Sequence, residues 1–168
     1  MGGITGAQKT DLVFLSKGIT INKDLYLDVL KHQVLPFMTK NNIAIFMQEN
    51  ASCHTFKLTK GWLDQQKILT MKWPPYSPDL NLIKHIWAWI KAHLHKKKCY
   101  ITNYSDLERK IRELWDDVDC AMLEKLFQSI SRRMAAVIDA KGGSIRYWIY
   151  LLFKPLAILW TFWIPNYL

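Results

Sequence analysis

The stretch Ile45–His54 reads IFMQENASCH, and the stretch Trp73–Trp87 reads WPPYSPDLNLIKHIW. The first is an apolar run that ends in an acid, Glu49, which is typical of a buried strand whose end emerges beside a cleft. The second has a Pro-Pro turn and then a serine followed by proline, which predicts that a helix begins at Pro78. The segment 50–83 separates Glu49 from Lys84. We expect the start of this helix to bring Lys84 opposite Glu49.

Glu49 is the candidate metal ligand of this pair. Phosphodiester cleavage commonly uses two divalent ions, and Mg²⁺ and Mn²⁺ prefer carboxylate oxygens that separate elements bring together. The alternative is an ordinary acid at a strand exit, hydrogen-bonded to Asn50 or to a backbone amide. Lys84 cannot ligate a metal, because its ammonium group has no free lone pair. Asp79 lies five residues away on the expected helix, so it would point to a different face.

The two stretches resemble the second and third catalytic blocks of the Tc1/mariner transposases, a family with an Asp-Asp-Glu metal site. The length of the segment 50–83 matches the spacing that the Tc1-like branch uses. The resemblance implies a ribonuclease-H-like α/β fold over residues 1–146, with a mixed sheet flanked by helices and a helical C-terminal part. It is carried by residues around the two site positions and by three further segments: Asn50, His54, Ser77–Asn81, Gly2–Thr5, Gly18–Pro36 and Arg132–Gly143.

Three departures from the family pattern affect the expected activity. The family's first aspartate would lie before Gly2, so we expect the first strand to be missing and the sheet to expose an unpaired edge. At the second position Glu49 replaces Asp, and at the third position Lys84 replaces Glu. The family's Mg²⁺ or Mn²⁺ would therefore meet at most a vestigial ligand in Glu49. We expect no catalysis by this chain alone.

The net charge of +9 and the pI near 9.5 favour a polyanionic partner. The run Lys96, Lys97 and Lys98 is a candidate DNA contact; the alternative is a solvated helix end stabilised by the helix dipole. Four further lysines could line a DNA groove: Lys57, Lys60, Lys72 and Lys84. We expect salt-sensitive, nonspecific DNA binding, and the resemblance implies a location in the nucleus. A DNA-binding or interaction protein that reuses the fold without catalysis stays open, as does a homodimer.

Residues 147–168 differ in composition from the rest of the chain. They contain one charge, Lys154, and eight aromatic residues. A membrane span needs about 20 apolar residues, and Lys154-Pro155 and Pro165 interrupt this segment. A tail-anchored membrane protein is therefore the weaker alternative, and the segment is interpreted as an extension outside the domain. The three cysteines have no metal-ligand spacing, and residues 1–6 do not resemble a signal peptide.

The remaining pattern predicts strands that alternate with helices, followed by helices alone. We expect strands over residues 11–15, 42–48 and 68–73, and helices over 23–38 with Asn22 as cap and over 55–66. A helix capped by Ser105, with Glu108 three residues later, should follow. One long helix is expected from about Cys120 to Ala140, where two glycines end it.

Overall fold

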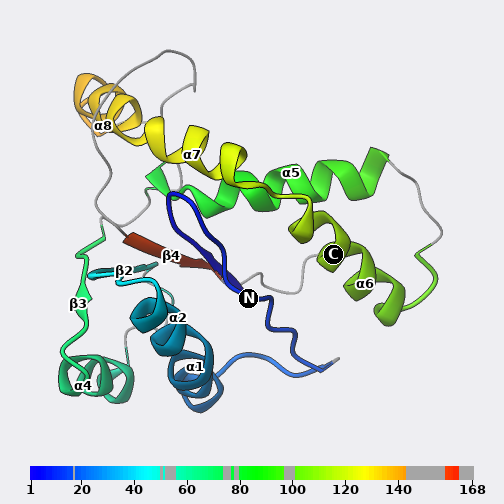
Figure 1. Cartoon of the computed structure of the whole chain (residues 1–168), viewed down its shortest axis with the longest axis horizontal. Helices are drawn as coiled ribbons and strands as arrows, with labels where there is room; N and C mark the ends of the chain where they lie inside the picture. Colours follow the sequence, from blue (N-terminus) through cyan, green and yellow to red (C-terminus); the bar gives the residue numbers. More distant parts are fainter. Residues whose placement is uncertain are drawn as a thin grey trace.

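The computed structural model describes residues 1–16, 18–49, 51, 56–73, 77, 80–96, 101–142 and 158–162. Its centre is a mixed four-stranded sheet with the strand order β1-β4-β2-β3. The strands are β1 (Gly2–Ile4), β2 (Ile45–Gln48), β3 (Leu69–Thr70) and β4 (Ile158–Phe162). β2 runs parallel to both β3 and β4, whereas β1 and β4 are antiparallel. Figure 1 shows helices on both sides of this sheet. The predicted α/β class with a mixed sheet is confirmed.

One face of the sheet is covered by the helices that precede and follow β2. These are α1 (Lys23–Val29), the π-helical turn η1 (Leu30–Val34), α2 (Leu35–Lys40) and α4 (Lys57–Gln65). Phe46 of β2 points to this side and packs with buried residues of these helices. The cluster consists of Ile21, Tyr26, Leu30, Val34, Met38, Ile43, Phe46 and Leu63. The expected cap is confirmed, because the Asn22 side chain accepts hydrogen bonds from the first backbone amides of α1.

The opposite face is covered by α5 (Ile83–Lys96), α6 (Tyr104–Asp116) and α7 (Cys120–Gln128). Met47 follows Phe46 in β2 and points to this side, since neighbouring residues of a strand face opposite sides of the sheet. The rings of Trp87 and Trp115 stack here with centroids 5.3 Å apart, which joins α5 to α6. Both helices turn an apolar face to the core, where Ile83, Ile86, Trp87, Ile90, Ile111, Leu114 and Trp115 are buried.

The expected strand over residues 11–15 is not a regular strand. The segment turns back along β1, where the Thr10 amide donates to the Gly3 carbonyl and the Val13 amide donates to the Met1 carbonyl. Lys9 leaves this segment and reaches the end of α6. Its ammonium group donates to the carbonyls of Trp115, Asp116 and Val118. The N-terminal segment is thereby fastened to the helical layer.

Three helix boundaries differ from the sequence prediction. α5 begins at Ile83, later than the predicted start at Pro78, and Pro78 itself lies outside the described residues. α6 is capped by Asn103, whose side chain accepts from the Asp106 amide at 2.9 Å, so Ser105 lies inside the helix. The long C-terminal helix is two helices, because Ser129 separates α7 from α8 (Ile130–Asp139).

β4 was not expected from the sequence. It lies between β1 and β2 and pairs with both. We expected the sheet to expose unpaired backbone where the first strand is missing; in the structure the backbone of β1 and β2 is paired by β4 instead. Part of the segment 147–168 belongs to the sheet, although most of that segment lies outside the described residues. Among the described helices, none is long and apolar enough to cross a membrane.

Candidate functional site

Glu49 and Lys84 meet at the edge of the sheet where β2 ends. The Lys84 Nζ lies 3.6 Å from the Glu49 Oε2, which confirms that the two positions face each other. Glu49 directly follows β2, and Lys84 lies in the first turn of α5. The backbone amide of Lys84 donates to the carbonyl of Asn81 at 3.1 Å, which sets the start of this helix. The pair is partly shielded from water, with 21% of the Glu49 side chain and 35% of the Lys84 side chain exposed.

The surroundings of Glu49 act on its pKa in two directions. Burial raises the pKa of the Glu49 carboxyl above its usual value, and the nearby Lys84 ammonium partly opposes this rise. Lys84 therefore supplies the counter-charge for a carboxylate that is largely removed from water. A divalent ion would have to displace or repel this ammonium group to reach Glu49.

No second carboxylate reaches Glu49 from the neighbouring strands. β4 and β3 lie on either side of β2, with Thr161 opposite Gln48 and Thr70 opposite Phe46. Their sequences, ILWTF and LT, contain no acid. Within the described residues, no group of three His, Cys, Asp or Glu side chains could hold a metal ion. The residues that the structure places here do not fit the metal site that the resemblance implies.

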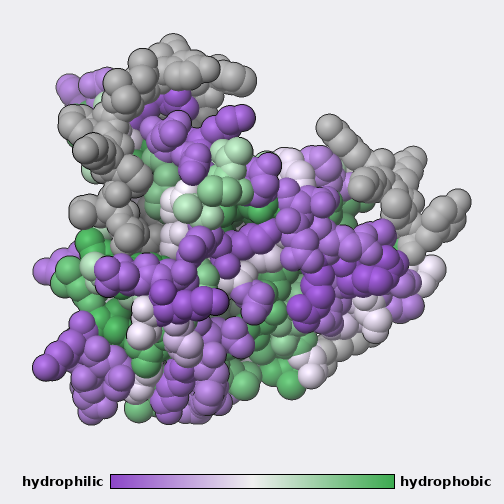
Figure 2. Space-filling model, in the orientation of Figure 1, coloured by the Kyte–Doolittle hydropathy of each residue, from purple (hydrophilic) through white to green (hydrophobic). Residues whose placement is uncertain are grey.

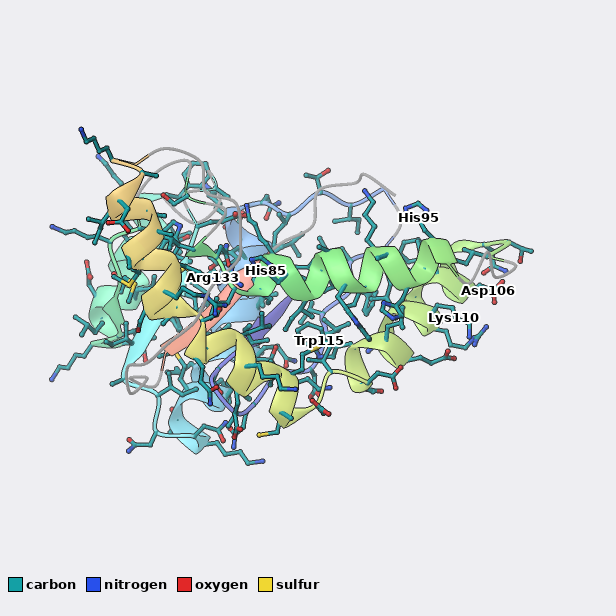
Figure 3. All side chains as sticks on the ribbon, turned by 90° about the horizontal axis from the view of Figure 1, so that it is seen from above. His85, His95, Asp106, Lys110, Trp115 and Arg133 are labelled. Carbon is teal, nitrogen blue, oxygen red and sulfur yellow. The ribbon has the colours of Figure 1, made fainter. Side chains whose placement is uncertain are left out.

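A histidine and an arginine connect the first turn of α5 to α8. Figure 3 shows His85 and Arg133 facing each other between these helices. The Arg133 Nη1 donates to the His85 Nε2 at 2.5 Å, and the Arg133 Nε donates to the Ser129 hydroxyl at 2.7 Å. As the acceptor, the His85 Nε2 carries no proton. Only 6% of Arg133 is exposed. Sequence reasoning did not predict this link; the signal was an Arg pair within an otherwise apolar helical pattern.

Three lysine residues lie toward the end of the sheet that carries Glu49. The parallel strands β2 and β3 have their C-terminal ends at the same end of the sheet. Lys72, two residues after β3, therefore lies at the same end as Glu49. Lys57 begins α4, the helix that leads the chain back from this edge to the start of β3. Lys57 and Lys72 are exposed. This placement brings three of the four predicted groove lysines, Lys57, Lys72 and Lys84, to one end of the sheet.

Several predicted site residues lie outside the described part of the chain. Asn50, His54 and Asp79 are among them, as are Lys97 and Lys98. Lys96 is the last residue of α5. Because Lys84 begins the same helix of 14 residues, Lys96 is three turns away from the Glu49–Lys84 pair. His95 marks that far end in Figure 3.

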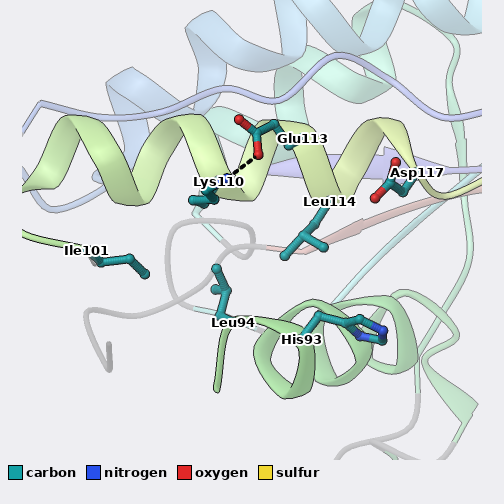
Figure 4. A pocket seen from close by; sticks show the side chains of 7 residues that line it. All are labelled: His93, Leu94, Ile101, Lys110, Glu113, Leu114 and Asp117. Atoms are coloured by element: carbon teal, nitrogen blue, oxygen red, sulfur yellow. Dashed lines mark hydrogen bonds and ion pairs between the residues drawn. The ribbon is translucent and has the colours of Figure 1, made fainter. Parts of the chain in front are cut away.

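A small hollow of about 40 Å³ lies between the C-terminal half of α5 and α6 (Figure 4). The Lys110 Nζ and the Glu113 Oε2, 2.7 Å apart, close one side of it. The rest of its lining consists of His93, Leu94, Ile101, Leu114 and Asp117. A larger open groove of about 480 Å³ follows α7. Its α8 end is basic, with Lys125, Arg132 and Arg133, and its other end is acidic, with Asp117 and Asp119.

The model of the DDE superfamily endonuclease family matches residues 4–108, which include β2, α5 and the Glu49–Lys84 pair. The chain belongs to this family. Curated relatives place it beside the Tc1-like transposases. It is 28% identical over 129 residues to the transposable element Tcb2 transposase of Caenorhabditis briggsae, which covers 76% of this chain and 46% of the relative. It is 30% identical over 103 residues to the Tc1 transposase of Caenorhabditis elegans, covering 61% of this chain and 37% of the relative. The chain thus spans less than half the length of these relatives.

Solved structures of the Mos1 transposase share the fold of this DDE-family chain. The Mos1 catalytic domain with Raltegravir and Mn superposes with a TM-score of 0.70 at 17% identity, over 84% of this chain and 74% of that chain. The Mos1 mariner paired end complex with Mn gives a TM-score of 0.75 at 18% identity, over 84% of this chain and 43% of that chain. The ribonuclease-H-like fold class and the Tc1/mariner transposase ancestry of the chain are therefore confirmed.

Proposed function

We propose that this chain is a degenerate derivative of a Tc1-like DDE transposase that has lost metal-dependent nuclease activity and keeps salt-sensitive, sequence-independent DNA binding in the nucleus. The observation that carries the proposal is the ion pair between Glu49 and Lys84, 3.6 Å apart at the end of β2. In this pair the positive charge beside the Glu49 carboxylate comes from the Lys84 side chain. In a metal site it would come from a bound metal ion.

The chemistry of the site supports the loss of cleavage. A two-metal mechanism needs several carboxylates around the reacting phosphate. Among the described residues no group of three His, Cys, Asp or Glu side chains could hold a metal ion, and the Glu49 carboxylate is paired with the Lys84 ammonium group. The Mos1 catalytic domain has been crystallised with Mn and with Mg, so these are the metal ions considered for this chain. For this chain, the ammonium group of Lys84 opposes their binding.

The same charges support retained affinity for DNA. Phosphate groups are attracted by cations in a manner that needs no base contacts. The topology places Lys57, Lys72 and Lys84 toward the end of the sheet where β2 ends, and the whole chain carries a net charge of +9. The basic end of the α7 groove adds Arg132 and Lys125. Solved Mos1 complexes contain a transposon end, and DNA is the corresponding partner proposed for this chain.

Cleavage is tested with a supercoiled plasmid in Mg²⁺ or Mn²⁺ buffer. We expect no nicking above the buffer control. The activity part of the proposal would be overturned by metal-dependent nicking that disappears in the variant Glu49→Gln. That variant removes the carboxylate charge and keeps the shape of the side chain, so a contaminating nuclease would be recognised by activity that survives it.

Binding is tested by fluorescence anisotropy with duplexes of unrelated sequence. We expect equal affinities for these duplexes and a loss of about tenfold or more between roughly 50 and 200 mM salt. The double variant Lys57→Gln/Lys72→Gln should reduce the slope of log K against log salt by about 2. Lys40→Gln/Lys67→Gln is the matched control, since Lys40 precedes β2 and Lys67 precedes β3. Both lysines therefore lie at the other end of these strands. Affinity that does not change with salt would contradict the DNA role.

A second candidate function is a non-enzymatic interaction protein that reuses the fold. It is favoured by exposed apolar side chains in β3 and at the start of α4: Leu69 is 62%, Leu58 47% and Phe56 46% exposed. The two candidates make different predictions for the anisotropy experiment. An interaction protein without a DNA role would not distinguish the two double variants.

A further inference from the structure

The strand β4 comes from the far end of the chain, yet it fills an inner position of the sheet. In the strand order β1-β4-β2-β3, β1 and β2 are joined only through β4. Trp160 lies opposite both Ile4 and Met47, and Thr161 lies opposite both Gly3 and Gln48. Each of these two β4 residues thus has a backbone partner on either side. Without β4, the two flanking strands would be separated by two strand spacings, about 10 Å.

The position that β4 fills between β1 and β2, here called the slot, is bordered by buried residues of both strands. Gly2, Gly3 and Ile4 are buried on the β1 side, and Phe46 and Met47 are 0% exposed on the β2 side. Buried amide and carbonyl groups need partners, because leaving them unpaired costs free energy at each group. An extended segment of another part of the chain supplies them in the structure.

The sequence of the segment suits this place. β4 reads ILWTF, which contains β-branched and aromatic residues and no charge. A strand covered by helices on both faces is expected to be apolar throughout, without alternation. The low charge of residues 147–168, which in the sequence resembled an interrupted membrane segment, is consistent over residues 158–162 with an inner position in a sheet.

We propose that the slot between β1 and β2 is a strand-binding site, and that its ligand is the chain's own C-terminal segment Ile158–Phe162. The ligand class is an uncharged extended peptide of β-branched and aromatic residues. The described part of the chain up to Gly142 forms the acceptor, and the sheet is completed only when the last segment inserts. This inference goes beyond the proposed function and does not depend on DNA binding or on the metal site.

Hydrogen exchange of the full-length chain tests the occupant directly. The amides of Leu159–Phe162 should exchange as slowly as those of Phe46–Gln48, since both rows belong to one ladder. Amides of Leu159–Phe162 that exchange at the rate of an unstructured peptide would overturn the proposal. The mass of the chain is measured in the same sample. A monomer supports insertion within one chain, whereas a dimer that exchanges this strand would overturn the assignment to the chain's own segment.

The same substitution, threonine to proline, is then compared at the inner strand and at the edge strand. Thr161→Pro affects the inner strand, and Thr70→Pro affects the edge strand β3. We expect Thr161→Pro to lower the melting temperature more than Thr70→Pro and to release the amides of both β1 and β2. Complete unfolding of Thr161→Pro, with Thr70→Pro still folded, would give the same support. Equal effects of the two substitutions, or protection of β1 and β2 that is unchanged in Thr161→Pro, would contradict the proposal.

Discussion

At the scale of single residues, Lys84 carries the central argument for the proposed loss of the metal site. A glutamate at this position would add a metal ligand, whereas the lysine places an ammonium group 3.6 Å from the Glu49 carboxylate. The change reverses the sign of one side chain and leaves the helix that carries it in place, because Ile83 and Ile86 still anchor α5 in the core. The residues that anchor this turn in the core therefore differ from the residue that sets its charge beside Glu49.

The pKa of Glu49 should report the loss of its partner. Burial raises this pKa and Lys84 lowers it, so Lys84→Met should raise the pKa further. A raised pKa in the folded state gives stability that is present below the unfolded value of 4.5 and is lost as the pH rises through the folded value. Lys84→Met should therefore lose more stability than the wild type on going from acid to neutral pH.

This prediction is checked by the carboxyl carbon shift of Glu49 in a pH titration, together with urea unfolding in acid and at neutral pH. At neutral pH we expect a loss of about 1 kcal/mol in Lys84→Met, since the pair is partly solvated. Lys40→Met, at the opposite edge of the sheet, is the control and should leave the pKa of Glu49 unchanged. An unchanged pKa in Lys84→Met would mean that the two charges do not interact in solution.

Lys9 is a second residue whose charge is used inside the fold. Its ammonium group donates to carbonyls at the end of α6, including Asp116 at 2.9 Å and Val118 at 2.7 Å. Cations are favourable at helix C-termini, and charged hydrogen bonds contribute about 1.5–3 kcal/mol. Lys9→Met should lower the free energy of unfolding by about 2 kcal/mol in urea titrations. A free energy of unfolding that stays at the wild-type value in Lys9→Met would show that solvent replaces these bonds.

At the scale of elements, short polar side chains decide where the helices begin and end. Asn103 and Ser105 both have the chemistry of a cap, and a capping-box pattern favoured Ser105. In the fold Asn103 accepts from the Asp106 amide, and the helix starts earlier. Ser129 has a similar effect between α7 and α8. Its hydroxyl donates to the Leu126 carbonyl and accepts from Arg133, which turns one predicted helix into two.

The two candidate caps of α6 can be compared directly. Asn103→Ala should cost about 1 kcal/mol in the free energy of unfolding, because it removes the acceptor for the Asp106 amide. Ser105→Ala should change it by less than about 0.5 kcal/mol, since alanine is favourable inside a helix. Thermal and urea unfolding of both variants measure this difference. The reverse order of the two losses would return the cap to Ser105.

At the scale of the whole molecule, β3 is an edge strand of the sheet that the described residues form. Figure 2 shows apolar side chains on the left of the molecule, over β3, where 62% of Leu69 is exposed. An exposed edge strand with apolar neighbours favours association between copies. We expect concentration-dependent self-association through this edge in sedimentation velocity. Leu69→Lys should reduce it without lowering the melting temperature, whereas unchanged association would place the contact elsewhere.

Local patterns predicted the parts of the fold that local interactions determine. The apolar run before Glu49 and the helix expected after the Pro-Pro turn placed Glu49 and Lys84 opposite each other, and the structure confirms this. The position of β4 depends on pairing between opposite ends of the chain, such as Gly3 with Thr161. Composition alone cannot distinguish a strand buried on both faces from an apolar extension. The link between His85 and Arg133 was not predicted because it also depends on a contact between distant parts of the chain, on two separate helices.

The most direct test of the proposed loss of the metal site is Mn²⁺ binding followed by electron paramagnetic resonance of the free ion. We predict that the wild-type chain leaves the free Mn²⁺ signal unchanged at millimolar concentrations of the ion. The variant Lys84→Glu removes the ammonium group and adds a carboxylate beside Glu49, so it should bind Mn²⁺ more tightly than the wild type. Stoichiometric binding by the wild-type chain that is lost in Glu49→Gln would contradict the account.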